Sequence, residues 1–130
     1  MRRVVVDTSV LAAMTFGEPD APQWSFRLEG AQLFAPTLLR YELSSVARKK
    51  CRQHPGHIRQ ILLALDLTLD PRRGITWVDP NPVDVVLLSN ATGLSSYDAS
   101  YLWLAGFLEA DLVTRDRELA AVHDALADGR

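Results

Sequence analysis

The chain has one cysteine in 130 residues, which excludes an internal disulfide bond. Chains without disulfides are typical of a reducing compartment. No apolar run approaches the roughly 20 residues that a membrane helix needs. The apolar stretch that follows Arg2 and Arg3 is broken at Asp7, which excludes a secretory signal. We therefore expect a cytoplasmic protein without a membrane anchor.

An excess of charge of one sign is also lacking. The chain carries 14 Lys and Arg against 16 Asp and Glu, a net charge of −2. This charge balance does not by itself indicate a protein that binds nucleic acid. It does not exclude one, because clustered acids would cancel basic residues elsewhere, and a local basic patch could then bind nucleic acid. The length and the apolar fraction of 48% predict one globular domain over residues 1–130.

Strand and helix patterns alternate along the chain. Short β-branched or apolar runs predict strands at 4–6, 32–35, 74–78 and 112–114. Helical periodicity predicts helices at 8–14, 21–28, 37–52, 57–67, 82–91, 95–110 and 117–126. This alternation predicts an α/β fold, with a parallel sheet covered by helices on both faces.

Four acids stand where acids are unusual. Asp7 and Asp116 end apolar strand patterns, Glu42 interrupts the apolar stripe of a predicted helix, and Asp98 begins a helix that is apolar nearly all round. Burying an unpaired carboxylate is very costly. If the four converge, they require divalent cations, and hard oxygen ligands select Mg²⁺ or Mn²⁺. The pattern points to metal-assisted phosphodiester chemistry.

Each acid also has a purely structural interpretation. Asp7 and Asp116 precede helices and could be N-caps, and Ser95 with Asp98 fits a capping box. Glu42 could pair with a buried arginine or reach water at a helix edge. However, Asp7 and Asp116 lie just beyond two strands, and parallel α/β sheets bind ligands at the carboxyl ends of their strands. This placement favours a shared site.

Four segments carry these acids in order, at residues 4–11, 36–43, 93–102 and 112–116. They resemble the four motifs of the PIN domain, and their order, spacing and total length resemble the VapC toxins of type II toxin–antitoxin pairs. The resemblance implies a three-layer α/β/α sandwich with a central sheet of four or five strands. It also implies a metal-dependent endoribonuclease that hydrolyses RNA, in which one or two Mg²⁺ or Mn²⁺ ions are held by the catalytic acids Asp7, Glu42, Asp98 and Asp116.

Further expectations follow from the same resemblance. The hydroxyls of Thr8, Ser9 and Thr114 would orient the ligands or the substrate. Ser45 is a departure, because many relatives have asparagine three residues after the second acid. The expected partners are an RNA substrate, a cognate VapB-type antitoxin and a second copy of the chain in a homodimer, with DNA bound only through the antitoxin.

RNA must be held by positive charge. Arg115 and Arg117 flank Asp116, so they are the best candidates for RNA binding. Glu118 could be a peripheral acid, although a solvated helix residue is the simpler interpretation. The alternative function is non-enzymatic: a PIN-like module that binds antitoxin or RNA without cleaving it. A phosphoaspartate enzyme of the haloacid dehalogenase type would need a second aspartate at Ser9, so it is disfavoured.

Overall fold

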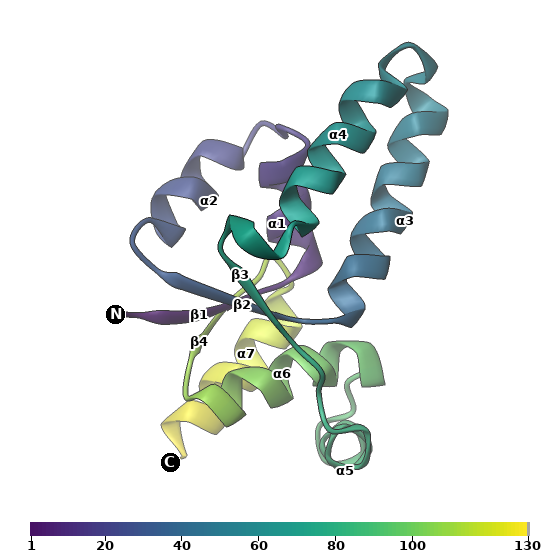
Figure 1. The fold of residues 1–130 in the computed structure, drawn as a ribbon. Helices are drawn as coiled ribbons and strands as arrows, with labels where there is room; N and C mark the ends of the chain where they lie inside the picture. The colour runs from purple at the N-terminus through teal and green to yellow at the C-terminus, as the bar shows by residue number, and fades with distance from the viewer. Residues whose placement is uncertain (130) are drawn as a thin grey trace.

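A four-stranded parallel sheet forms the centre of the molecule (Figure 1), in a computed structural model that describes residues 1–129. The strand order is β3-β2-β1-β4. The strands are β1 (Arg3–Val6), β2 (Gln32–Pro36), β3 (Ile75–Val78) and β4 (Asp111–Val113). The three valines of β1 are fully buried, as expected for a central strand with helices on both faces.

Helices cover both faces of the sheet, so the predicted three-layer α/β architecture is confirmed (Figure 1). One face carries α1 (Thr8–Thr15), α2 (Ala21–Leu28), α3 (Leu38–Gln53) and α4 (Ile58–Leu69). The other carries α5 (Pro82–Thr92), α6 (Ser96–Leu108) and α7 (Arg117–Asp128). Two short 3₁₀ turns, Pro55–His57 and Pro71–Arg73, flank α4. Within residues 1–129, no helix has both the length and the hydropathy to cross a bilayer.

The element boundaries differ from the sequence expectation at two informative places. The strand predicted at 32–35 extends by one residue to Pro36, and the helix predicted at 37–52 is α3, which begins at Leu38. The helix predicted to run to residue 110 ends at Leu108, because Glu109 takes a left-handed conformation with φ of 52°. Its amide donates back to the carbonyls of Ala105 and Gly106, which satisfies the end of α6.

All four strands run in the same direction, so their carboxyl ends meet at one edge of the sheet. Asp7 follows β1 directly, and Thr114 follows β4 directly. The β1–β4 pairing aligns Val6 with Val113, which brings these two following residues side by side. This edge of the sheet is where the fold places the candidate site.

Candidate active site

Asp7 is held from three sides at the end of β1. Its Oδ1 accepts hydrogen bonds from the Val10 amide (3.1 Å) and from the Ser9 hydroxyl (2.7 Å). Its Oδ2 accepts a hydrogen bond from the Thr114 hydroxyl. The carboxylate therefore does cap α1, as the structural interpretation anticipated. A cap alone does not explain why a residue only 7% exposed also receives two hydroxyl donors from separate segments.

Glu42 lies in the second turn of α3 and is fixed by two hydroxyls. Its Oε1 accepts hydrogen bonds from Thr8 Oγ1 (2.9 Å) and from the Tyr101 hydroxyl. These two hydroxyl oxygens are themselves 2.8 Å apart. The carboxylate group is therefore oriented by neutral donors, and the buried arginine that was considered as its partner is not there in the described residues 1–129.

Tyr101 is a member of the site that sequence reasoning did not select. Its side chain is 2% exposed. Burial, and then its hydrogen bond to Glu42, raises the pKa of its hydroxyl, so the group keeps its proton and remains a donor. A signal was present in the sequence: Tyr101 lies three residues after Asp98, and residues at that spacing share one face of a helix.

Asp116 and Thr114 are joined across the β4–α7 loop. Asp116 Oδ1 accepts from the amides of Glu118 (2.9 Å) and Leu119 (3.2 Å), which caps α7. The Thr114 hydroxyl accepts a hydrogen bond from the Asp116 amide (2.9 Å) and donates to Asp7. One buried hydroxyl therefore links the segments that carry the first and fourth acids.

Asp98 lies in the first turn of α6, which Ser95 caps by accepting from the Asp98 amide at 3.1 Å. Burial raises the pKa of the Asp98 carboxyl first, and the negative charges of Asp116, Glu42 and Asp7 raise it further. Glu118 adds a smaller contribution of the same sign. The structure thus brings all four predicted acids into one electrostatic field, and it gives Glu118 a peripheral place in that field.

The chemistry of this donor set fits a divalent cation. Within residues 1–129, none of the four acids forms an ion pair with a basic side chain. Glu42 Oε2, both oxygens of Asp98 and Asp116 Oδ2 accept no hydrogen bond there. Hard oxygen atoms with a surplus of negative charge are what Mg²⁺ and Mn²⁺ select. Within residues 1–129, however, no three His, Cys, Asp or Glu side chains are arranged as a group that could hold a metal ion, so the support for a cation is the chemistry of the donors and not a formed coordination geometry.

The site is accessible from solvent beside Glu42. Thr8, Glu42, Ser45, Val46 and Tyr97 line an open pocket of about 440 Å³. Ser45, the position where many relatives have asparagine, therefore faces the same pocket as Glu42. A substrate can reach the hydroxyl and carboxylate groups without a change in fold.

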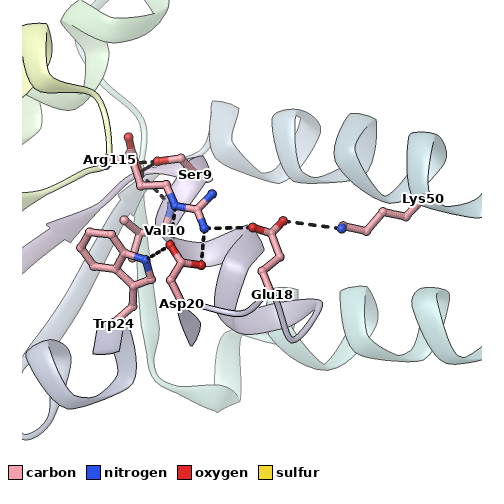
Figure 2. A network of polar contacts seen from close by, with 8 residues as sticks. Ser9, Val10, Glu18, Asp20, Trp24, Lys50 and Arg115 are labelled. Carbon is pink, nitrogen blue, oxygen red and sulfur yellow. Dashed lines mark hydrogen bonds and ion pairs between the residues drawn. The ribbon is translucent and has the colours of Figure 1, made fainter. Parts of the chain in front are cut away.

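The two arginines beside Asp116 differ in their surroundings, and Figure 2 shows those of Arg115. The Arg115 guanidinium binds Glu18 and Asp20, and its hydrogen bond is the main reason that the pKa of Asp20 is lowered. Arg117 is exposed at the start of α7 and forms no ion pair within residues 1–129.

Comparison with known proteins agrees with this geometry. The sequence pattern of the PIN domain family matches residues 4–125, which is nearly the whole chain. The chain belongs to the PIN domain family. PIN domains are typically metal-dependent nucleases and usually bind Mg²⁺. No curated protein matches the sequence.

The fold also matches a solved crystal structure. PAE2754 from Pyrobaculum aerophilum is similar with a TM-score of 0.71, over 99% of this chain and 97% of that one. The two sequences are 23% identical. At that identity the likeness establishes the fold, and the assignment to a family rests on the match over residues 4–125.

Proposed function

We propose that this PIN domain is a Mg²⁺- or Mn²⁺-dependent endoribonuclease. The observation that carries the proposal is the arrangement of the four acids. Hydroxyl and amide donors hold Asp7, Glu42 and Asp116, and within residues 1–129 none of the four acids forms an ion pair. Burial, and then the charges of the other acids, raise the pKa of Asp98. Four carboxylates that stay together without a counter-charge repel one another, and a divalent cation would relieve that repulsion.

Asp7, Glu42, Asp98 and Asp116 would hold the cation. A divalent cation supplies Lewis-acid chemistry: it polarises phosphoryl oxygens and acidifies water for attack on the phosphodiester. The protein's own groups keep the carboxylates oriented. Tyr101 and Thr8 fix Glu42, while Ser9 and Thr114 fix Asp7. Preorganised ligands of this kind need not rearrange when the substrate arrives.

The RNA backbone would be held by positive charge near the acids. Arg117 supports this role, because it is exposed next to Asp116. Arg115 was expected to share the role, but its Nε and Nη2 are already bound to Asp20 and Glu18.

We further propose that the protein is the toxin of a VapBC-type pair in the cytoplasm. PIN domain proteins often pair with antitoxins, which supports a VapB-type partner at this site. An exposed apolar face on α5 and α6 supports a homodimer. On α6, Phe107 is 67% exposed and stacks on Trp103 at 5.0 Å between ring centroids, and Val83, Val86 and Leu87 of α5 are also exposed.

The test is cleavage of varied structured RNAs by purified, antitoxin-free protein with Mg²⁺ or Mn²⁺. An EDTA control and Asp98→Asn accompany the wild type. We expect cleavage that EDTA and the substitution both abolish. Folded protein that binds RNA and cation but cleaves none of the substrates would instead support the non-catalytic binding module.

A further inference from the structure

The segment Thr114–Asp116 joins β4 to α7 and carries two residues of the candidate site, with Arg115 between them. The Arg115 side chain points toward Glu18 and Asp20 of the α1–α2 loop (Figure 2). Its Nε donates to Asp20 Oδ2 (2.9 Å), and its Nη2 contacts Asp20 Oδ1 and donates to Glu18 Oε2 (2.9 Å). Arg115 therefore pairs with Asp20 through two nitrogens and with Glu18 through one of them. Such paired, charge-assisted contacts specify both orientation and distance.

The carboxylates that receive Arg115 are themselves held in place (Figure 2). The indole of Trp24, a buried residue of α2, donates to Asp20 Oδ2 at 2.8 Å. Lys50 of α3 lies with its Nζ 3.5 Å from Glu18 Oε1. The receptor for Arg115 is thus built from the α1–α2 loop, α2 and α3. Arg115 itself binds the α1–α2 loop, and α2 and α3 hold the two acids of that loop, so Arg115 is a structural tie and not a free surface cation.

The backbone of Arg115 connects this tie to the acids. Its amide donates to Ser9 Oγ at 3.4 Å, and the same hydroxyl donates to Asp7. The residues before and after Arg115 belong to the candidate site. The Thr114 hydroxyl donates a hydrogen bond to Asp7, and Asp116 caps α7. Any movement of the β4–α7 loop would therefore displace groups that hold Asp7, and would displace Asp116 itself.

We propose that Arg115 is a positioning residue, which fixes the β4–α7 loop so that Asp116 and Asp7 face a common cation. This inference rests on the proposed function, because it assumes that both acids are cation ligands. It assigns Glu18 and Asp20 a part in the site, although neither acid is among the expected ligands. It also replaces the expectation that Arg115 binds RNA phosphate.

Asp20→Asn separates positioning from phosphate binding, because the two roles predict opposite effects. If Arg115 positions the loop, weakening its receptor loosens the site and weakens cation binding. If Arg115 binds phosphate, loss of the competing carboxylate releases the guanidinium and tightens RNA binding. The variants are Arg115→Gln, Asp20→Asn, their double mutant and Arg115→Lys, which keeps the charge.

The chain supplies a matched control pair. Arg72 binds Asp70 through two nitrogens, at 3.1 and 3.0 Å, in a 3₁₀ turn outside the site. Arg72→Gln and Asp70→Asn change net charge by the same amounts as Arg115→Gln and Asp20→Asn. They therefore correct for the general effect of charge on RNA affinity.

Two measurements give the answer without relying on cleavage alone. Thermal unfolding across a Mn²⁺ titration yields the half-saturating cation concentration, and a fluorescent single-stranded RNA in EDTA yields RNA affinity. We expect Arg115→Gln and Asp20→Asn each to raise the half-saturating Mn²⁺ concentration roughly ten-fold, as loss of groups that orient metal ligands does. The double mutant should be no worse than either single mutant, and Arg115→Lys should recover part of the loss. RNA affinity should change no more than in the control pair.

Each other result overturns the proposal. Unchanged Mn²⁺ titrations in Arg115→Gln and Asp20→Asn would remove the positioning role while leaving the nuclease proposal intact. Tighter RNA binding by Asp20→Asn than by Asp70→Asn, with weaker binding by Arg115→Gln than by Arg72→Gln, would restore phosphate binding. A wild type that shows no Mn²⁺ dependence in unfolding or in cleavage would end both proposals. Asp20→Asn preserves shape and Arg115→Lys preserves charge, so either carries the test if Arg115→Gln does not fold.

Discussion

Two groups of acids in this chain differ in how their charge is balanced. The loop acids, Glu18 and Asp20, are bound by Arg115 and Lys50 of the same chain. Among the sheet-edge acids, Asp7, Glu42 and Asp116 accept hydrogen bonds from hydroxyls or amides, and Asp98 accepts none in the described chain. Within residues 1–129, none of these four acids forms an ion pair. The same residue types therefore occur in a neutralised and in an unneutralised cluster.

Asp20 of the loop acids and Asp98 of the sheet-edge acids have pKa shifts of opposite sign. The hydrogen bond from Arg115 lowers the pKa of Asp20, whereas burial and neighbouring carboxylates raise that of Asp98. The negative charge of the loop acids is therefore balanced by basic side chains, whereas that of the sheet-edge acids is not balanced within the described chain. A cluster of carboxylates does not by itself indicate a metal site. A cluster that no basic side chain of the protein neutralises favours one.

The largest expected effect comes from neutralising one sheet-edge acid. Glu42→Gln should lower metal-dependent RNA cleavage at least about 100-fold, because charge stabilisation by a bound cation is worth several kcal/mol. The glutamine can still accept the hydrogen bonds from Thr8 and Tyr101, so the melting temperature without metal should not fall. Cleavage rates over a Mg²⁺ series provide the measurement.

Asp66→Asn is the control for that prediction, since Asp66 is an exposed residue of α4 outside both clusters. It should cleave like the wild type. Equal losses in the two variants would mean that general charge, and not the sheet-edge cluster, controls activity.

Cation binding should also stabilise the fold. At a concentration 100 times its Kd, a ligand that binds only the folded state adds about 2.7 kcal/mol to the free energy of unfolding. We expect saturating Mg²⁺ or Mn²⁺ to raise the melting temperature of the wild type clearly, and Asp98→Asn to lose most of that rise. Differential scanning calorimetry with and without EDTA measures it. A rise of equal size in Asp98→Asn would place the bound cation away from the sheet edge.

The third effect tests how Glu42 is held. Tyr101→Phe removes one of the two hydroxyl donors to Glu42 Oε1, a hydrogen bond to a charged group that is worth about 1.5–3 kcal/mol. Thr8 remains as a donor, so we expect a loss at the lower end of that range. It should appear as a half-saturating Mn²⁺ concentration that is roughly ten-fold higher. Tyr41→Phe is the matched control, because Tyr41 is 78% exposed and its hydroxyl makes no hydrogen bond in the described chain. The prediction is wrong if the two phenylalanine variants titrate alike.

The fold was predictable, and the four acids could be selected as candidate site residues, because both depend on patterns of neighbouring residues in the sequence. β-Branched runs closed by acids marked β1 and β4, and Glu42 stood out against its apolar stripe. Asp98 could not be separated from a capping role by sequence, because Ser95 does cap α6. Only the three-dimensional field of the other carboxylates distinguishes it.

The parts that sequence did not predict depend on contacts between distant segments. Tyr101 reaches Glu42 across 59 positions, and Arg115 reaches Asp20 across 95. The sequence around Arg115 suggests a free cation beside Asp116, because no nearby residue indicates that two carboxylates far earlier in the chain bind it. The tertiary contacts of an arginine decide whether it is available to bind a ligand or stabilises the fold.

The smallest expected effect is the pH dependence of stability without metal. The pKa of Asp98 is raised above its ordinary value near 3.8, so the folded protein binds this proton more tightly than the unfolded chain does. The stability gained from the proton is complete below about pH 3.8 and is lost as the pH rises through the folded-state pKa. Asparagine does not ionise, so Asp98→Asn should gain stability relative to the wild type as the pH rises from 4 to 7 in EDTA. Thermal melts at four pH values measure this difference. Asp66→Asn should not show it, and saturating Mg²⁺ should reverse it, because the cation stabilises the wild type more than Asp98→Asn. A difference that is constant across the pH range would mean that neither burial nor the other sheet-edge acids raise the pKa of Asp98 in the folded protein.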